Sequence, residues 1–359
     1  MKHAHYDFDP SGSVYACCDG PDLLVYSGED VPMWNLTLEG FPVGVHAARQ
    51  RIAVVDSEGR FVSFLAHDGT RVVDQRLDFD VVATAGAHDG RIAASGATGT
   101  VLLTPDGDVT NLPVQGAVSL AFGGVSEGLL AAVWPSGRMV VLSAVQGTVV
   151  AEVQLEERLL HVSWSSLGQW VVASVSRLAL LDGLSPGALT VTRRVDVGGP
   201  VEGLAVADDG VCAAVIIGQQ SISLYEVMEG MPVGSIQLHR TVAAVSFGAG
   251  TMLGIGLEDG ESNRANLSMG GSWRSPQAFG RGQQNWPIQI DVDQDSLRTV
   301  LVAARSGGQP VARMSAAPVS AEDGEKGNGC LIVIAVVFGT ATLCGLCTGF
   351  AGFLWALFG

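Results

Sequence analysis

A short strand, a tight turn and a second strand recur about every forty residues along most of this chain. In the first copy, residues 6–16, apolar residues alternate up to Pro10-Ser11-Gly12, and a run containing Val14 and Ala16 follows. This pattern predicts a β-hairpin, because Pro, Ser and Gly suit tight turns and β-branched residues favour strands. A fixed period of this length restricts the fold to repeated units that pack on one another.

The first unit covers residues 3–40 and predicts strands at 4–8, 13–17, 22–26 and 33–38. Further units open near residues 41, 81, 117, 159, 200 and 241, and an eighth opening strand is predicted at 287–292. Runs such as 211–217 are continuously apolar, which is typical of strands buried on both faces. The period breaks between 270 and 284, and no clear fourth strand follows 314. Eight openings favour eight units, and the incomplete last copies keep seven open.

Composition limits the partners. The formal charge is −16, from 36 acidic and 20 basic residues, and this field opposes phosphate backbones, so nucleic acid is not expected as a partner. Cys17, Cys18 and Cys212 lie in the repeat region as an odd number, which favours reduced thiols in a reducing compartment. The N-terminus has no apolar core of a secretory signal. We expect the repeat region to be cytoplasmic.

The segment Tyr6-Asp7-Phe8-Asp9-Pro10-Ser11-Gly12 resembles the strand-to-turn pattern of the WD40-like and related β-propeller families, and the resemblance extends over residues 3–314. Met33-Trp34-Asn35 is the segment most similar to their Trp-Asp dipeptide. The usual Gly-His and Trp-Asp dipeptides are missing. The resemblance implies an all-β fold, a β-propeller of seven or eight four-stranded blades. It supplies no binding residues, and we interpret Asp7 and Asp9 as turn and edge residues.

The C-terminal part differs from the repeats. We assign residues 1–314 to the propeller and 315–329, rich in Gly, Ala, Ser and charged residues, to a flexible linker. Residues 330–359 contain no charged residue, and a helix crossing a membrane needs roughly 20 apolar residues. These residues therefore predict a single-pass transmembrane helix that tethers the protein to a lipid bilayer.

Small residues recur along one side of this predicted helix, at Ala341, Gly345, Gly349 and Gly352. Such residues let two membrane helices approach closely, and Gly345 and Gly349 form a G-x-x-x-G pattern. A homo-oligomer assembled through the helix is therefore possible, although small residues are common in membrane helices generally.

No catalytic motif or cofactor site is visible. Asp291, Asp293 and Asp295 make a D-x-D-x-D, but Ser296 stands where a calcium-binding EF-hand needs Gly, so a turn is the favoured interpretation. The seven histidines form no metalloprotease pattern, and His161 is expected to be structural. We expect no metal, no cofactor and no enzymatic activity.

One stretch reverses the acidic character of the chain. Residues 263–290 carry arginines and aromatic residues but no acid, and Arg and Trp are favoured interface anchors. The candidate partner-binding residues are Arg264, Trp273, Arg274, Phe279, Arg281 and Trp286. An ordinary loop whose aromatic residues cover the propeller edge explains the same residues equally well.

These observations predict a membrane-tethered β-propeller that acts as a protein-interaction scaffold or sensor on the cytosolic face. Two alternatives stay open. One is a ligand-binding or enzymatic propeller that uses its central channel. The other is a subunit of a membrane oligomer assembled through the C-terminal helix.

Overall fold

The computed structural model describes residues 5–292, with gaps at 10, 12, 29–30, 41, 57–59, 184–188, 208–211, 228–229, 249–251, 259–261, 268–271 and 275–288. The chain divides into two units, Met1–Gln309 and Pro310–Gly359. All described residues belong to the first unit, and only that unit is discussed below. The boundaries predicted at 314 and 329 lie outside the described residues.

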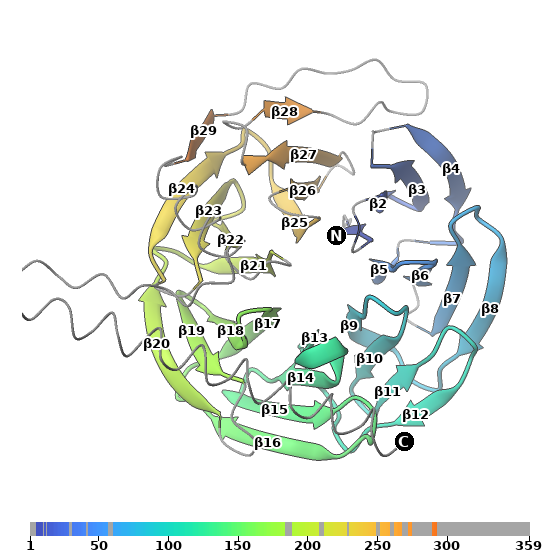
Figure 1. Ribbon diagram of the computed structural model, residues 1–359, viewed down its shortest axis with the longest axis horizontal. Helices are drawn as coiled ribbons and strands as arrows, with labels where there is room; N and C mark the ends of the chain where they lie inside the picture. Colours follow the sequence, from blue (N-terminus) through green and yellow to red (C-terminus); the bar gives the residue numbers. More distant parts are fainter. Residues whose placement is uncertain are drawn as a thin grey trace, which may run out of the picture. The chain divides into compact units, whose positions relative to one another are not determined.

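The described strands form seven antiparallel sheets arranged around a common centre (Figure 1). Six sheets have four strands and one has five. In every sheet the first four strands follow the chain order outward from the centre. This arrangement confirms the all-β propeller predicted from the repeat, and the sheets are called blades 1 to 7 in chain order.

The innermost strand opens each blade. These strands are β1 (Tyr6–Phe8), β5 (Gly44–Ala47), β9 (Val81–Gly86), β13 (Ser119–Gly123), β17 (Leu159–Ser165), β21 (Val201–Val206) and β25 (Val242–Phe247). The second strands are β2 (Val14–Asp19), β6 (Arg51–Val55), β10 (Ile92–Gly96), β14 (Leu129–Val133), β18 (Gln169–Ser174), β22 (Cys212–Ile217) and β26 (Met252–Leu257).

The third strands are β3 (Asp22–Ser27), β7 (Phe61–Ala66), β11 (Thr100–Leu103), β15 (Arg138–Ser143), β19 (Arg177–Asp182), β23 (Ser221–Glu226) and β27 (Ser262–Asn266). The outermost strands are β4 (Pro32–Thr37), β8 (Arg71–Arg76), β12 (Val109–Asn111), β16 (Val149–Gln154), β20 (Thr190–Asp196), β24 (Pro232–Gln237) and β28 (Ser272–Arg274). A 3-10 helix, η1 (Val125–Glu127), interrupts the turn between β13 and β14.

The strand predicted to open an eighth unit has another role. It is β29 (Gln289–Val292), which pairs antiparallel with β24 as the fifth strand of blade 6, with Gly234 opposite Val292. The interpretation of this strand as the start of a further blade is therefore wrong. The backbone N–H and C=O groups of an alternating apolar strand can form hydrogen bonds with any sheet edge that has unpaired groups. The sequence of the strand alone therefore does not determine which sheet it joins.

Burial follows the position of each strand in its blade. The second strand β10 is buried throughout, whereas the outermost strand β4 alternates between half-buried and exposed residues. Continuous apolar runs therefore lie between two neighbouring blades, as predicted. The hydrophobic core is divided into layers between blades, and in one of them Leu102 of blade 3 packs in the same cluster as Leu130 and Leu142 of blade 4.

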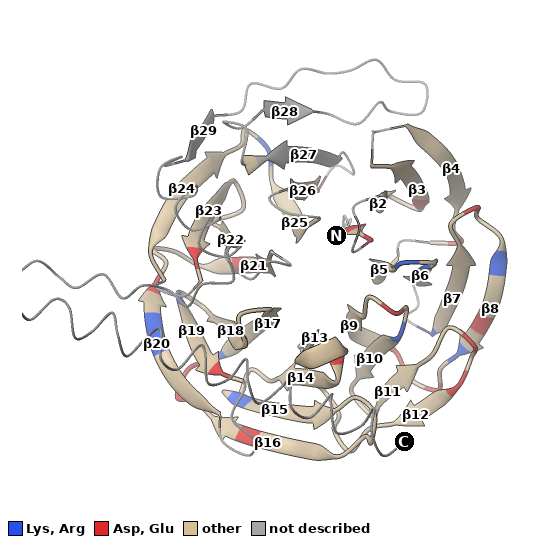
Figure 2. Cartoon of the chain, in the orientation of Figure 1, with Lys and Arg blue, Asp and Glu red and all other residues tan. Residues whose placement is uncertain are grey.

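In several blades a side chain at the start of the third strand contacts a side chain of the outermost strand, and such a contact is called a clamp below. In blade 5, Arg177 lies opposite Asp196, and its Nε donates to the Asp196 carboxylate over 2.6 Å. Equivalent clamps join Asp22 to Thr37, Phe61 to Arg76 and Ser221 to Gln237. Arg138 lies opposite Gln154 but binds Glu152, two residues earlier in the outermost strand. Solvent screens most of these contacts, since most of the residues are exposed. Figure 2 shows charged positions on β8, β15, β16 and β20, on the outer part of the ring.

Blade 7 contacts blade 1 directly. Phe8 packs on Gly248, where an added Cβ would lie 2.7 Å from the Phe8 ring. Ser246 Oγ donates to Asp7 Oδ1 over 3.1 Å, although the two residues are 239 positions apart in the chain. The first and last described blades are therefore joined by both apolar packing and a hydrogen bond.

Candidate functional site

The predicted partner-binding residues fall on the edge of the described region. The backbone places Arg264 in β27 opposite Arg274 in β28, and Trp273 opposite Ala265. The first half of the predicted loop is thus part of blade 7, because these residues complete its third and fourth strands. Phe279, Arg281 and Trp286 lie outside the described residues.

The predicted packing face of the C-terminal helix, Ala341, Gly345, Gly349 and Gly352, also lies outside the described residues. Within the described ranges, no helix is long and apolar enough to cross a membrane. No group of three or more His, Cys, Asp or Glu residues in the same ranges is placed to hold a metal ion. Cys17 and Cys18 are buried thiols of β2.

A chain of polar contacts crosses the innermost strands of four blades. Asp7 of blade 1 accepts hydrogen bonds from Ser246 Oγ of blade 7 and from the Ala47 N–H of blade 2, the latter over 3.0 Å. His46 of blade 2 lies beside Asp7, with 3.8 Å between Nδ1 and the carboxylate. His46 Nε2 then meets Thr84 Oγ1 of blade 3 at 2.9 Å.

Asp7 lies in β1, an edge strand of its sheet, as expected, but its contacts with blades 2 and 7 were not predicted. Asp9, by contrast, does hold the turn, because its carboxylate accepts from the Val14 N–H and from the hydroxyls of Ser11 and Ser13. No local pattern distinguishes the two, since the partners of Asp7 come from other blades. The recurrence of polar residues at one position of the first strand, namely Asp7, His46 and Ser246, is the signal that was available.

Thr84, His46 and Asp7 have the residue types of a nucleophile, a base and an orienting acid. Their geometry favours a structural role. The His46-to-Asp7 separation of 3.8 Å exceeds hydrogen-bonding distance, and both carboxylate oxygens of Asp7 accept other donors. His46 also fits against Gly86, where an added Cβ would lie 2.5 Å from the His46 Cβ. This contact chain ties neighbouring blades together.

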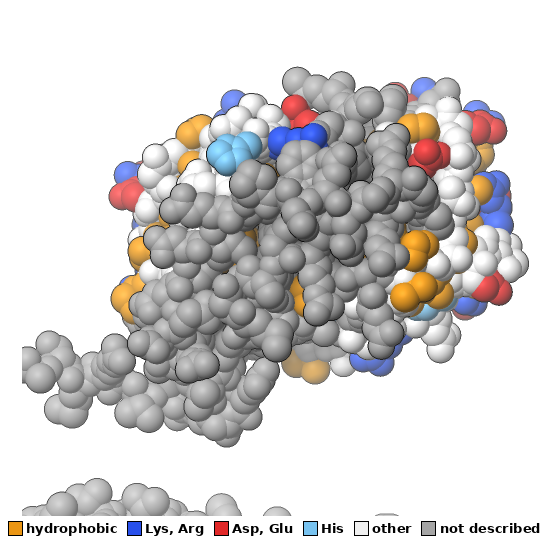
Figure 3. Space-filling view, turned by 90° about the horizontal axis from the view of Figure 1, so that it is seen from above, with side chains coloured by type: hydrophobic (Ala, Val, Ile, Leu, Met, Phe, Trp, Pro, Cys, Tyr) orange, Lys and Arg blue, Asp and Glu red, His pale blue; other side chains and the backbone are white. Residues whose placement is uncertain are grey.

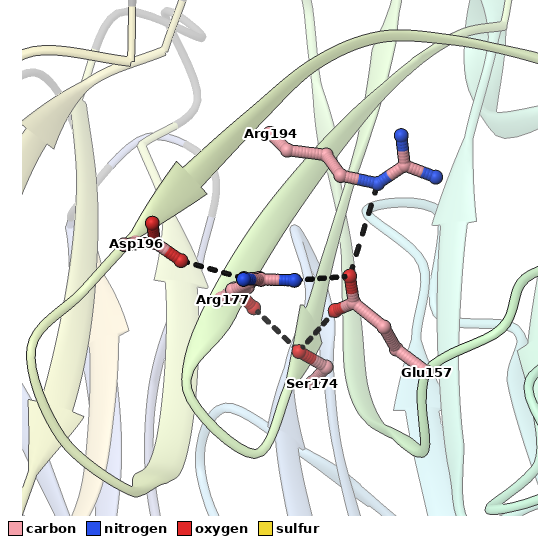
Figure 4. Close-up of polar contacts among 5 residues, drawn as sticks. All are labelled: Glu157, Ser174, Arg177, Arg194 and Asp196. Carbon is pink, nitrogen blue, oxygen red and sulfur yellow. Dashed lines mark hydrogen bonds and ion pairs between the residues drawn. The ribbon is translucent and has the colours of Figure 1, made fainter.

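Blade 5 carries a cluster of arginines and acids (Figure 4). Glu157 accepts a hydrogen bond from Ser174 Oγ over 2.7 Å and one from Arg177 over 3.4 Å, and Arg194 Nε lies 3.8 Å away. The hydrogen bonds of Arg177 to Asp196 and then to Glu157 raise the pKa of its guanidinium. Each arginine labelled in Figure 4 lies beside a carboxylate, and these contacts join β20 and β19 to the turn before β17.

A hollow of about 410 Å³ is lined by Arg60, Arg76, Leu77 and Asp78, in blade 2 and the turn that leads to blade 3. Arg60 is paired with Asp80 over 2.6 Å, and Arg76 lies over the Phe61 ring at 5.7 Å. Both cations are thus engaged by neighbouring side chains. The hollow offers a ligand little unbalanced charge.

The turn between β13 and β14 has an unusual backbone. Ser126 and Glu127 both have a φ of 52°, a left-handed conformation that costs a residue other than glycine of order 1–3 kcal/mol. Glu127 fixes this conformation, because its Oε2 accepts the His88 N–H over 2.6 Å and its carbonyl accepts Arg91 Nη2 over 3.1 Å. Burial raises the pKa of the Glu127 carboxyl above its usual value, against the attraction of nearby His88.

This fixed turn exposes an apolar side chain. Val125 is 87% exposed, and Val145 in the turn between β15 and β16 is 81% exposed. They are the two most exposed large apolar side chains of the described residues. Their turns are joined by a hydrogen bond from the Ala144 N–H to the Gly128 carbonyl over 2.8 Å. Val125 and Val145 are called the blade-4 apolar pair below.

Both members of the pair lie on one face of the ring. The turns after the first and third strands of every blade leave the sheet at the same end, and this end is called the β1–β2 face. Other exposed apolar residues in its turns are Val31, Leu167 and Met231. By contrast, the ring edge seen in Figure 3 shows apolar side chains scattered among polar ones in its described part. The β1–β2 face of blade 4 is therefore the best candidate for a binding surface.

Comparisons with known proteins show similarity of fold only. No protein-family model and no curated protein matches this sequence. Among solved structures, the chain is similar to the β-propeller domain of Cps50 (Swd1) from Myceliophteria thermophila, with a TM-score of 0.60 and 14% identity, over 71% of this chain and 93% of that one.

Two further structures are similar to this chain. Hsv2 from Kluyvelomyces marxianus has a TM-score of 0.57 and 12% identity, over 81% of this chain and 98% of that one. Raptor from Chaetomium thermophilum has a TM-score of 0.57 and 11% identity, over 71% of this chain and 27% of that one. At these identities the similarity supports the β-propeller fold and carries no activity across.

Proposed function

We propose that this protein is a non-enzymatic interaction propeller that binds a protein partner through the β1–β2 face of blade 4. The observation that carries the proposal is the blade-4 apolar pair, in which one valine is presented by a turn that Glu127 fixes. Burying an exposed valine at an interface yields about 1.5–3 kcal/mol, and a rigid turn loses little entropy on binding.

The polar groups support a scaffold over an enzyme. Both oxygens of the Asp7 carboxylate accept hydrogen bonds from neighbouring blades, and the Glu157 carboxylate contacts arginines and a serine. These contacts stabilise the ring, so they offer no activated nucleophile. The alternative of a ligand-binding central channel would be favoured by a small molecule bound among the innermost strands.

The test is recovery of a partner by in-cell cross-linking and mass spectrometry. The full chain is compared with a Val125→Asp/Val145→Asp variant and with a control, Val72→Asp, whose valine is 43% exposed on the outermost strand of blade 2. A protein recovered by the wild type and the control, but lost with the double variant, supports the proposal. An identical set of partners for all three proteins contradicts it.

The proposal includes a seven-bladed ring and a membrane tether. The direct contact of blade 7 with blade 1 supports seven blades, and the charge-free residues 330–359 support a single transmembrane helix behind the linker 315–329. The propeller would then face the cytosol. Deleting residues 330–359 should move the protein from the membrane fraction to the soluble fraction, and an unchanged membrane fraction would contradict the tether.

Two subsidiary parts of the proposal concern residues named from the sequence. Replacing Trp273 and Arg274 by Ala should reduce partner recovery if this part of blade 7 contributes to the interface. Replacing Gly345 and Gly349 by Leu should dissociate an oligomer in detergent if the tail assembles through its small residues. Unchanged recovery of the partner would contradict the role of blade 7 in the interface, and an unchanged oligomer size would contradict assembly through the tail.

A further inference from the structure

The blade-4 apolar pair adjoins turns of blade 3 at two places. Near the centre of the ring, Glu127 binds the N–H of His88, and Asp89 follows in the same turn. Farther out, the turn that carries Val145 reaches β12, since a Cβ added at Gly147 would lie 3.8 Å from the Thr110 methyl. The apolar pair and the blade-3 turns therefore form one continuous surface.

The blade-3 turns are themselves packed together. A Cβ added at Gly90, in the turn after β9, would lie 2.9 Å from Pro105 in the turn after β11. Asp89 belongs to the first of these turns, and Asp106 and Asp108 belong to the second. All three aspartates are exposed. The blade-3 turns thus carry three carboxylates, and Asp108 lies two residues before Thr110, the neighbour of Gly147 in the turn that carries Val145.

The charges on this surface do not balance. Arg91 faces Asp89 at 2.7 Å and is itself only 15% exposed, so it neutralises one of the three carboxylates. In contrast, the described turns after β13, β15 and β17 contain one charged residue, Glu127, whose carboxylate binds the blade-3 turn. An uncharged apolar area therefore borders an acidic one, and Figure 2 shows acidic positions recurring around blades 2 and 3.

We propose that this surface binds a basic amphipathic segment of a protein partner, in which apolar side chains lie next to a group of Lys or Arg residues. The inference rests on the proposed function and specifies its partner. The apolar side chains cover Val125 and Val145, and the cations of the segment lie over Asp106 and Asp108. Complementary charge would guide the encounter and fix the orientation, while apolar contact supplies most of the affinity.

The acidic border also excludes other occupants. Anionic lipid headgroups and nucleic acid phosphates carry the same sign of charge as Asp106 and Asp108, and both would be repelled at this surface. A second copy of this face would bring the same carboxylates together. A cationic protein segment is the occupant that satisfies both halves of the surface.

The test uses the full chain in non-ionic detergent and three fluorescent peptides of about 18 residues. The first has Leu on one helical face and Lys on the other, the second replaces its Lys by Glu, and the third replaces its Leu by Gln. Binding is measured by anisotropy at about 0.05 M and about 0.5 M NaCl. The variants are Val125→Asp/Val145→Asp, Asp106→Asn/Asp108→Asn and a charge-matched control, Asp78→Asn/Glu156→Gln, whose residues lie in turns at the opposite end of the blades.

The Leu/Lys peptide should bind the wild type at least tenfold more tightly than the other two peptides. The Val125→Asp/Val145→Asp variant should lose at least about tenfold in affinity at both salt concentrations. The Asp106→Asn/Asp108→Asn variant should lose about fivefold at low salt and less than about twofold at high salt, because salt screens exposed charges. The Asp78→Asn/Glu156→Gln control should bind like the wild type.

Equal weakening by the two acid-removing variants would overturn the inference, because it would show a response to net charge alone. An affinity for the Leu/Lys peptide that is unchanged in Val125→Asp/Val145→Asp would overturn the inference as well. Neither result contradicts the proposed function, which is decided by recovery of the natural partner. If that partner depends on the apolar pair but not on Asp106 and Asp108, the interaction surface stands and the basic partner is wrong.

Discussion

His161 should make this propeller less stable in mildly acidic solution. The residue lies in the innermost strand β17, opposite Ala173 of β18. Burial lowers the pKa of its imidazole from 6.5 to about 4, because the protein interior disfavours the charged form. This environment agrees with the structural role expected from the sequence.

The sign and size of the effect follow from proton linkage. The folded-state pKa lies below the unfolded value, so as pH falls from about 6.5 towards 4 the unfolded chain takes up a proton that the folded protein refuses. The stabilisation is complete above about pH 7 and falls progressively below it. With these two pKa values, lowering the pH from about 7.5 to about 5.5 reduces the free energy of unfolding by at most about 1.4 kcal/mol.

The assay is urea unfolding of the full chain in detergent, followed by tryptophan fluorescence at several pH values in this range. The lower limit keeps the protein above its isoelectric point of about 4.7. His161→Gln removes the titrating group, and His239→Gln is the matched control at an exposed histidine. The difference between the wild type and His161→Gln should shrink by about 1 kcal/mol on acidification. A pH dependence that is the same for the wild type, the variant and the control would refute the argument.

Three further predictions concern the ring and the candidate site. Asp7→Ala should destabilise the protein by about 1–3 kcal/mol, because the Ala47 N–H and the Ser246 hydroxyl lose their acceptor. A smaller loss in urea unfolding than for Asp22→Ala, which removes one contact of a half-buried side chain with Thr37, would contradict this role. Gly123→Ala should lower the free energy of unfolding by about 1–3 kcal/mol by the same measurement, since its Cβ would lie 2.5 Å from the buried Trp170 ring. Gly198→Ala is the control, because it has open space around the added Cβ and measures the cost of a positive φ alone. Glu127→Ala should make the turn that carries Val125 more mobile, which is measured as faster hydrogen exchange at residues 124–128. Unchanged exchange there would show that the Glu127 side chain is not needed to fix the turn.

Much of the fold follows from local sequence. Pro, Gly, Asp and Ser punctuate runs of apolar residues at a nearly constant spacing, and each run is long enough for one strand. The predicted openings near residues 117, 159 and 200 agree with β13, β17 and β21 within two residues. Continuous apolar runs identify the strands buried between blades, because only those strands have two covered faces.

Other features depend on contacts that cross blades. Asp7 and Asp9 occur two residues apart in similar surroundings, yet one holds a local turn and the other joins three blades. The clamps of the outermost strands occupy one position but use ion pairs, hydrogen bonds and a cation–π contact. Their chemistry differs from blade to blade, so the sequence shows no repeated residue. The role of β29 was missed for the same reason, since an edge strand is placed by its neighbour.

The candidate binding surface illustrates this division most clearly. By itself, the sequence determined a ring of repeated hairpins, because turn chemistry and strand burial act over a few residues. It also set apart the charge-free tail and the arginine-rich stretch by composition. Only the tertiary structure decided that Val125 and Val145 are both exposed in turns joined by a hydrogen bond, and that turns of blade 3 adjoin these turns. Those contacts join residues up to about forty positions apart, and their geometry depends on how neighbouring blades pack.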